Sequence, residues 1–292
     1  MERLLRPLAP LAAACTLTLG VLTGSAGCVG QQRASFERTV ADVLVPPEQE
    51  KQLGLKVKEE LEQKEKVQYL EDPVVTGYVQ EVTGKILPFA RRDRPDVTWS
   101  VKVINDPKTV NAFATPGGYL YVYSGLLLAA DDTAEVAGVL GHEAGHVVAR
   151  HSARQMVNAF GVEALASLAL GKNPGAASQL AAGLAGKTAL LAYSRGDESE
   201  ADEYGARYAS AAGYDPHGIA TFFAKLEKGA KQPGWAAFLS THPASADRAA
   251  HVNRYVVEHR LAGTAGRGGS DLARVKERIK AIPPPPAAAK GQ

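Results

Sequence analysis

The chain of 292 residues is 45% hydrophobic, and is therefore long and apolar enough to build a folded domain with a sizeable core. Its 33 basic and 31 acidic side chains nearly cancel, and no stripe of Lys and Arg alternates with aromatic residues. A net charge of +2 without such a stripe excludes nucleic acid as the expected partner.

The first residues have the pattern of an export signal. Arg3 and Arg6 form a positively charged start, residues 8–22 form an apolar stretch, and residues 24–28 are mostly small. This order is typical of a secretory signal peptide. We therefore predict a signal peptide at residues 1–28 that directs the chain out of the cytoplasm.

The end of this leader resembles a bacterial lipobox. Cys28 follows Ala26 and Gly27, as the lipidated cysteine does, although Ser25 stands where leucine is usual. We predict a lipoprotein attached by its lipid anchor to the periplasmic face of a bacterial membrane; plain secretion and an uncleaved anchor are the alternatives. Because Cys15 and Cys28 both fall in the leader, the mature domain has no internal disulfide.

Residues 29–47 form a polar tether, and a single folded domain is predicted over residues 48–260. Apolar residues at helical spacing predict helices, and alternation of apolar and polar residues predicts strands. The elements predicted ahead of the central motif are helices at residues 48–66 and 73–88 and strands at residues 97–104 and 119–123.

A turn made by Pro116, Gly117 and Gly118 precedes the second strand. The simpler interpretation is a hairpin in a small sheet. We favour a functional interpretation, in which one of the strands is an edge beside a cleft, where a peptide substrate adds as an extra strand.

Residues 133–151 carry the central motif. The stretch is rich in small and aliphatic residues, lacks proline and follows two aspartates, which predicts a helix. His142 and His146 are four residues apart, so they share a helix face and can bind one metal ion. Glu143 lies one step round the helix, where it can reach a water on that ion. The alternative is a chance His-Glu-x-x-His, but the helical context favours a zinc hydrolase.

Beyond the motif, two apolar helices are predicted at residues 153–170 and 176–193. They are too short and too charged to be membrane spans, and are either buried helices or a lining of the cleft. Three further helices are predicted. The first spans residues 194–212, the second begins at residue 215, and the last ends near residue 259. Residues 261–292 are expected to be a flexible Gly/Pro-rich tail that contains at most a short helix at 271–282.

A hydrolytic zinc site has three protein ligands, and the two histidines leave it one short. Glu198 and Asp202 are four residues apart and share a helix face, whereas Glu200 points elsewhere. By itself, an acidic cluster is more often a solvated surface. The need for one more ligand makes this cluster its predicted source.

These ordered motifs resemble the M48 family of zinc metallopeptidases, in its soluble or lipoprotein branch, over roughly residues 48–260. The resemblance is carried by His142-Glu143-Ala144-Gly145-His146 and Glu198-Ser199-Glu200-Ala201-Asp202, with support from Asn111-Ala112-Phe113, Gly213-Tyr214-Asp215-Pro216 and Thr241-His242-Pro243. It implies that His142, His146 and Glu198 bind one zinc ion and that Glu143 is the catalytic base. It also implies that Asp202 hydrogen-bonds a ligand imidazole and fixes its tautomer.

The same resemblance implies that Asn111 lies beside the substrate strand and that His242 and Arg248 lie near the substrate oxyanion. In some relatives the equivalent of His242 instead reaches the zinc and keeps the enzyme latent. The expected fold is α+β, a mostly helical zincin-like metallopeptidase with a small β-sheet whose edge strand lies beside the active-site helix.

The predicted function is a zinc-dependent endopeptidase of the bacterial cell envelope, with a zinc-activated water and Glu143 as general base. Its expected substrates are proteins and peptides, in particular unfolded envelope proteins, in quality control. The alternatives are a chaperone-like assembly factor with latent proteolysis and a hydrolase of a small amide. His151, five residues after His146, falls off the ligand face and is predicted to make a structural hydrogen bond.

Overall fold

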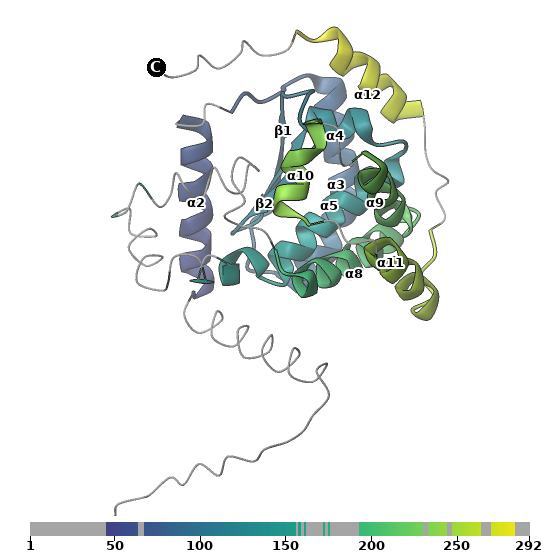
Figure 1. Cartoon of the computed structure of the whole chain (residues 1–292). Coiled ribbons are helices and arrows are strands. Elements are labelled where there is room, and N and C mark those ends of the chain that lie inside the picture. The colour runs from purple at the N-terminus through teal and green to yellow at the C-terminus, as the bar shows by residue number, and fades with distance from the viewer. Residues whose placement is uncertain are drawn as a thin grey trace, which may run out of the picture.

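The computed structural model describes residues 45–63, 67–155, 193–229, 233–243, 247–263 and 270–283, together with positions 157, 158, 161, 172 and 175. Over these residues the chain is mostly helical with one small mixed sheet, as the sequence predicts (Figure 1). The helices are α2 (Pro47–Gln63), α3 (Pro73–Asp93), α4 (Ser124–Ala129), α5 (Thr133–Val148), α8 (Arg195–Ala211), α9 (Gly218–Gly229), η2 (Pro233–Trp235), α10 (Ala236–Thr241), α11 (Asp247–Glu258) and α12 (Ser270–Ala281). The strands are β1 (Ser100–Ile104), β2 (Ala112–Thr115) and β3 (Tyr119–Tyr123).

The three strands form one sheet in the order β1-β3-β2, in which β1 runs parallel and β2 antiparallel to β3. The turn predicted at residues 116–118 joins β2 and β3 in a hairpin, whereas no strand was predicted at residues 112–115. The hairpin turns at Gly117 and Gly118, whose φ angles of 80° and 91° lie in the left-handed region that favours glycine. Within this sheet β2 is an edge strand, and it packs against α5, the helix that carries the central motif.

Alternation along the strands gives the sheet two apolar faces. Phe113 and Tyr121 lie on one face, in a cluster with Leu53 and Val57 of α2. Leu120 and the other strand residues whose side chains point the opposite way lie on the second face, in the main core with α3 and α5. The sheet therefore separates α2 from the other helices, as Figure 1 shows.

Helix α3 begins where the sequence predicts and ends later. Asp72 caps it by accepting hydrogen bonds from the backbone nitrogens of Val74 (3.0 Å) and Val75 (3.3 Å). The sequence predicts an end near Pro88, but the helix continues to Asp93. A proline inside a helix forfeits one backbone hydrogen bond, and here the burial of its neighbour Leu87 in the core holds the helical path.

Helix α5 lies at the centre of the fold. Every one of its residues is buried, and α3, α8 and α9 pack around it. Helix α9 contributes Phe222, Phe223 and Leu226 to the main core. The motif helix is therefore held on several sides by packing rather than lying on a surface.

The fold extends past residue 260, where the sequence predicts a flexible tail. Helix α12 packs on α3 and α4 and buries Leu272, Val275 and Ile279 in the main core. These three residues recur at helical spacing, so they form one apolar stripe that can be buried only by docking. The short helix that the sequence allows at 271–282 is thus a packed part of the domain.

Several predicted segments lie outside the described residues. They are the leader, most of the tether, nearly all of the apolar helices predicted at 153–170 and 176–193, and the last part of the tail. Of the helices that are described, none combines the length and the hydropathy needed to cross a bilayer.

Candidate metal centre

Two helices bring the central motif and the acidic motif together. Asp132 caps α5 by accepting a hydrogen bond from the backbone nitrogen of Glu135 (3.0 Å). Where α5 crosses α8, Gly141 faces Gly205, and a Cβ on Gly141 would lie only 3.1 Å from the Gly205 Cα. The missing side chains allow the two backbones to approach closely, which sets the separation of the side chains carried on either helix.

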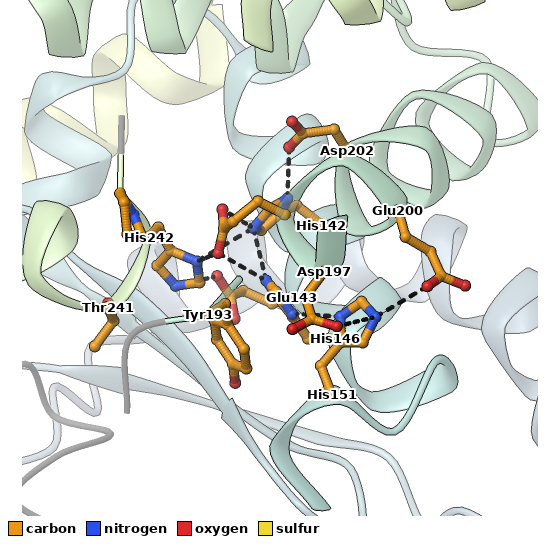
Figure 2. Close-up of polar contacts among 12 residues, drawn as sticks. His142, Glu143, His146, His151, Tyr193, Asp197, Glu200, Asp202, Thr241 and His242 are labelled. Atoms are coloured by element: carbon orange, nitrogen blue, oxygen red, sulfur yellow. Dashed lines mark hydrogen bonds and ion pairs between the residues drawn. The ribbon is translucent and has the colours of Figure 1, made fainter. Parts of the chain in front are cut away.

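Four buried side chains converge beside this crossing (Figure 2). The Nε2 atoms of His142 and His146 lie 2.9 Å apart. Glu198 of α8 presents its carboxylate to both, at 3.7 Å from the Nε2 of His142 and 3.6 Å from the Nε2 of His146. His242, directly after α10, adds a fourth potential ligand atom, and the four ligand atoms all lie within 4.8 Å of one another.

The donor set fits a zinc ion. Two ligand atoms at about 2.1 Å from a tetrahedral ion are separated by about 3.4 Å, close to the spacings among His142, His146 and Glu198. Burial lowers the pKa of both imidazoles well below the ordinary value, so they are neutral, as metal ligands must be. Burial alone would raise the pKa of Glu198, but His242 and Arg248 lower it and keep the carboxylate ionised.

Glu143 is also buried but lies beside the donor set rather than within it. Its Oε1 lies 3.3 Å from the Nε2 of His242. Burial raises the pKa of Glu143 to about 7, against the opposing effects of His242 and of the backbone amide of Ala114 on β2. A carboxylate with a pKa near neutrality is suited to accept and return a proton.

A buried ion pair lies behind His142. The Nδ1 of His142 is 2.9 Å from Oδ1 of Asp202, which binds the guanidinium of Arg248 at 2.6 Å and 2.9 Å. The same guanidinium reaches Oε2 of Glu198 at 2.7 Å and covers the ring of Phe223. Arg248 is therefore engaged with two carboxylates of the cluster, and Asp202 has the position of a partner that orients the His142 ring.

His242 contacts three members of the cluster. Its Nδ1 lies 3.0 Å from Oε1 of Glu198 and 3.3 Å from the Nε2 of His142, and its Nε2 faces Glu143. Burial lowers the pKa of His242, but the Glu198 and Glu143 carboxylates outweigh it and raise that pKa. The ring bridges the candidate ligands and the candidate base.

Asn111 lies apart from these contacts. It immediately precedes β2 and is fully buried, and neither its Oδ1 nor its Nδ2 has a hydrogen-bond partner among the described residues. No described contact joins it to the four converging side chains. The side-chain amide of Asn111 therefore has an unpaired carbonyl oxygen and an unpaired NH2 group directly ahead of the edge strand.

The structure adds Tyr193, which no sequence motif indicates. Its ring stacks on His146 with the centroids 3.9 Å apart and an interplanar angle of 18°, and its hydroxyl lies 2.8 Å from Oγ of Ser152. Tyr193 comes just before Ser194, the N-cap of α8, so the start of α8 covers one face of His146. In the sequence, the only signal for Tyr193 is that an aromatic residue stands directly before the helix predicted at residues 194–212.

Comparison with known proteins agrees with this geometry. The model of the family described as "Peptidase family M48" matches residues 73–256. The mitochondrial metalloendopeptidase OMA1 of Schizosaccharomyces pombe is 36% identical over 184 residues, which cover 63% of this chain and 53% of that protein. The metalloprotease LoiP of Escherichia coli is 39% identical over 148 residues, 50% of this chain and 58% of that protein.

A third relative is the beta-barrel assembly-enhancing protease of Escherichia coli, which is 30% identical over 166 residues. That match covers 54% of this chain and 34% of the relative. The chain spans about half the length of the first two relatives and about a third of the last. The matched region includes every residue of the converging cluster.

Proposed function

This chain belongs to peptidase family M48, and from that membership we propose that it is a zinc-dependent endopeptidase with one zinc ion per chain. The observation that carries the proposal is the convergence of His142, His146 and Glu198, a donor set of two histidines and one glutamate that is typical of catalytic zinc in peptidases. In this proposal those three side chains bind the metal, and Asp202 holds the ring of His142 through its Nδ1.

The proposed hydrolysis uses the buried base. When bound, zinc would polarise the peptide carbonyl and make a water molecule acidic near neutral pH. Glu143 accepts a proton from the attacking water on its carboxylate and then returns it to the leaving amine. His242 donates its Nε2 hydrogen to the developing oxyanion, a contribution worth about 3 kcal/mol of barrier for one such donor. Arg248, engaged with Glu198 and Asp202, opposes the effect of burial on the pKa of both carboxylates and, with His242, keeps Glu198 ionised.

The substrate is proposed to be an extended peptide. Because β2 is the edge of the sheet and packs against α5, a peptide that pairs with β2 would run past Glu143. The amide of Asn111, at the start of that edge, would bind the peptide backbone. Unfolded proteins present such extended segments, which supports them as the substrate class.

The test uses the full chain and its Glu143→Gln variant. We expect both proteins to bind one equivalent of zinc, measured by elemental analysis, and only the parent to cleave an unfolded protein, measured by mass spectrometry of the fragments. Because glutamine matches glutamate in shape, loss of cleavage with retained zinc isolates the missing base. Undiminished cleavage by Glu143→Gln would contradict the proposed role.

We also propose that the chain acts in the bacterial envelope as a lipoprotein with a role in protein quality control. The leader pattern at residues 1–28 supports export, and the similarity to the beta-barrel assembly-enhancing protease supports a role near envelope proteins. Lipidation at Cys28 is tested by the mass of the mature N-terminus. The Cys28→Ala variant should leave the membrane fraction, and its retention there would contradict lipid anchoring.

The position of His242 supports a second candidate, a chaperone-like assembly factor with latent proteolysis that binds clients in the cleft. As a fourth ligand, His242 would fill the position that a catalytic zinc keeps open. His242→Ala separates the two: cleavage falls if the ring donates to the oxyanion and rises if the ring blocks the metal.

A further inference from the structure

The second candidate ligand, His146, has its own partner behind it. The Nδ1 of His146 lies 2.8 Å from the Nδ1 of His151, and both rings are buried. The Nε2 of His151 lies 3.2 Å from Oε2 of Glu200 and 3.5 Å from Oδ1 of Asp197 (Figure 2). The contacts form a continuous line from a partly exposed pair of carboxylates to the ring that faces the cluster.

The geometry allows one arrangement of protons along this line. If His146 binds a metal through Nε2, the hydrogen of its neutral ring is on Nδ1. His146 donates that hydrogen to the Nδ1 of His151. Since this nitrogen accepts, the neutral ring of His151 must carry its own hydrogen on Nε2. The two nearby carboxylates accept the hydrogen from this second nitrogen, because a carboxylate can only accept.

The turn after α5 brings His151 back to His146. In a continuous helix these two residues, five positions apart, would not face each other, but α5 ends at Val148 and Arg150 has a φ of 58°. A left-handed conformation is strained for a non-glycine residue, because its Cβ approaches the following carbonyl oxygen. The Nε of Arg150 donates a hydrogen bond to Oε2 of Glu50 on α2 at 2.9 Å, and the Nη2 of the same guanidinium donates to the carbonyl of Val45. These contacts hold the strained residue.

The far end of the line is also fixed. Asp197 belongs to the capping box of α8 with Ser194, and it binds Nη2 of Arg154 at 2.5 Å. Asp197 and Glu200 lie on the same helix as Glu198, so the acceptors of the line move with the third candidate ligand. Helix α8 therefore carries both Glu198, a proposed ligand, and the two carboxylates at the end of the line behind His146.

We propose that His151 is a positioning residue for His146: it holds the ring in the Nδ1–H tautomer, and Glu200, with Asp197, holds His151 in the Nε2–H tautomer. The inference rests on the proposed zinc site, for which it adds the partner of the second histidine. It requires no catalytic contact, since His151 acts only through His146.

The first test measures zinc affinity by competition with a chelator, on the full chain. His151→Leu removes the acceptor and should weaken zinc binding by about 10–100-fold. His151→Asn keeps an oxygen close to the position of Nδ1 and should recover most of that loss. His217→Leu is the matched control, because the ring of His217 bonds Asn253 (2.7 Å) rather than a candidate ligand. Equal affinity in the parent and His151→Leu would overturn the proposal.

The second test reads the tautomers directly by nitrogen-15 NMR of the metal-free protein. We expect hydrogen on Nδ1 of His146 and on Nε2 of His151 in the parent, and loss of the single tautomer of His146 in His151→Leu. A parent with the opposite tautomers would overturn the relay. A parent that shows these tautomers but binds no zinc would instead contradict the proposed function, so the two failures are distinguishable.

The third test addresses the carboxylate end. Glu200→Leu removes one acceptor and should weaken zinc binding by only a few-fold, because Asp197 shares the same hydrogen. Glu200→Gln keeps an acceptor and should restore the parent affinity. A loss in Glu200→Gln as large as in His151→Leu would contradict the relay and indicate a role for the charge of Glu200.

Discussion

The two imidazoles of α5 are one helical turn apart and face the same point, yet they are supported in different ways. His142 is backed directly by the buried carboxylate of Asp202, which Arg248 neutralises. His146 is backed by a neutral ring, His151, and only through it by carboxylates that are partly exposed. The direct buried ion pair makes the His142 side of the site dependent on charge balance, whereas the His146 side depends on the path of the chain.

The largest expected effect comes from removing a proposed ligand common to both sides. Glu198→Ala should lose stoichiometric zinc, because two histidines alone do not complete the donor set. Glu200→Ala should keep it, since that residue acts only at the end of the relay. Elemental analysis of the purified variants measures both, and the reverse result would move the ligand assignment two residues along α8.

Substitutions behind His142 should lower the free energy of unfolding more than substitutions behind His146. Asp202→Ala leaves Arg248 with one fewer buried partner and should destabilise the fold by about 3–5 kcal/mol, as breaking a buried ion pair does. Denaturant unfolding measures this loss. His151→Leu removes no charge and should cost clearly less; equal losses would erase the contrast between the two sides.

The helices α5 and α8, which carry the proposed ligands, leave less space at Gly145 than at Gly141. A Cβ at Gly145 would lie 2.6 Å from the Cβ of Tyr204, a closer approach than the 3.1 Å at Gly141. We expect Gly145→Ala to destabilise the fold by about 1–3 kcal/mol and Gly141→Ala to cost less, since overpacking scales with the movement required. Thermal unfolding of the two variants compares them, and a more stable Gly145→Ala would contradict the crossing geometry.

The smallest effect is expected at a site remote from both imidazoles. Asp72→Ala removes the cap of α3 and should cost about 1 kcal/mol without changing zinc binding. Burial alone would raise the pKa of Asp72, but hydrogen bonds from Arg278 and two backbone amides lower it. The cap therefore stabilises the fold above the ordinary carboxyl pKa, and its contribution is lost as the pH falls through the lowered value.

Denaturant unfolding at neutral and at acidic pH tests this sign. The stability difference between the parent and Asp72→Ala should shrink on acidification. A difference that grows at low pH would show that the aspartate is not stabilised in its ionised form.

Helical spacing in the amino-acid sequence was enough to predict how the side chains of the two motifs are arranged on their helices. It put His142 and His146 on one face, Glu143 one step away, and Glu198 and Asp202 on a common face of a later helix. The sequence also predicted the turn at Pro116, Gly117 and Gly118 and the strand that follows it, because proline and glycine at a turn have local signatures. These features depend only on residues close together in the chain.

The other features of the site depend on contacts between residues that are far apart in the chain. The return of His151 to His146 depends on a left-handed Arg150 that Glu50, a hundred positions earlier, holds in place. The entry of His242 into the cluster, the engagement of Arg248 and the docking of α12 likewise depend on partners distant in sequence. The spacing of residues predicts which side chains share a helix face. What that face contacts depends on how one element packs on another.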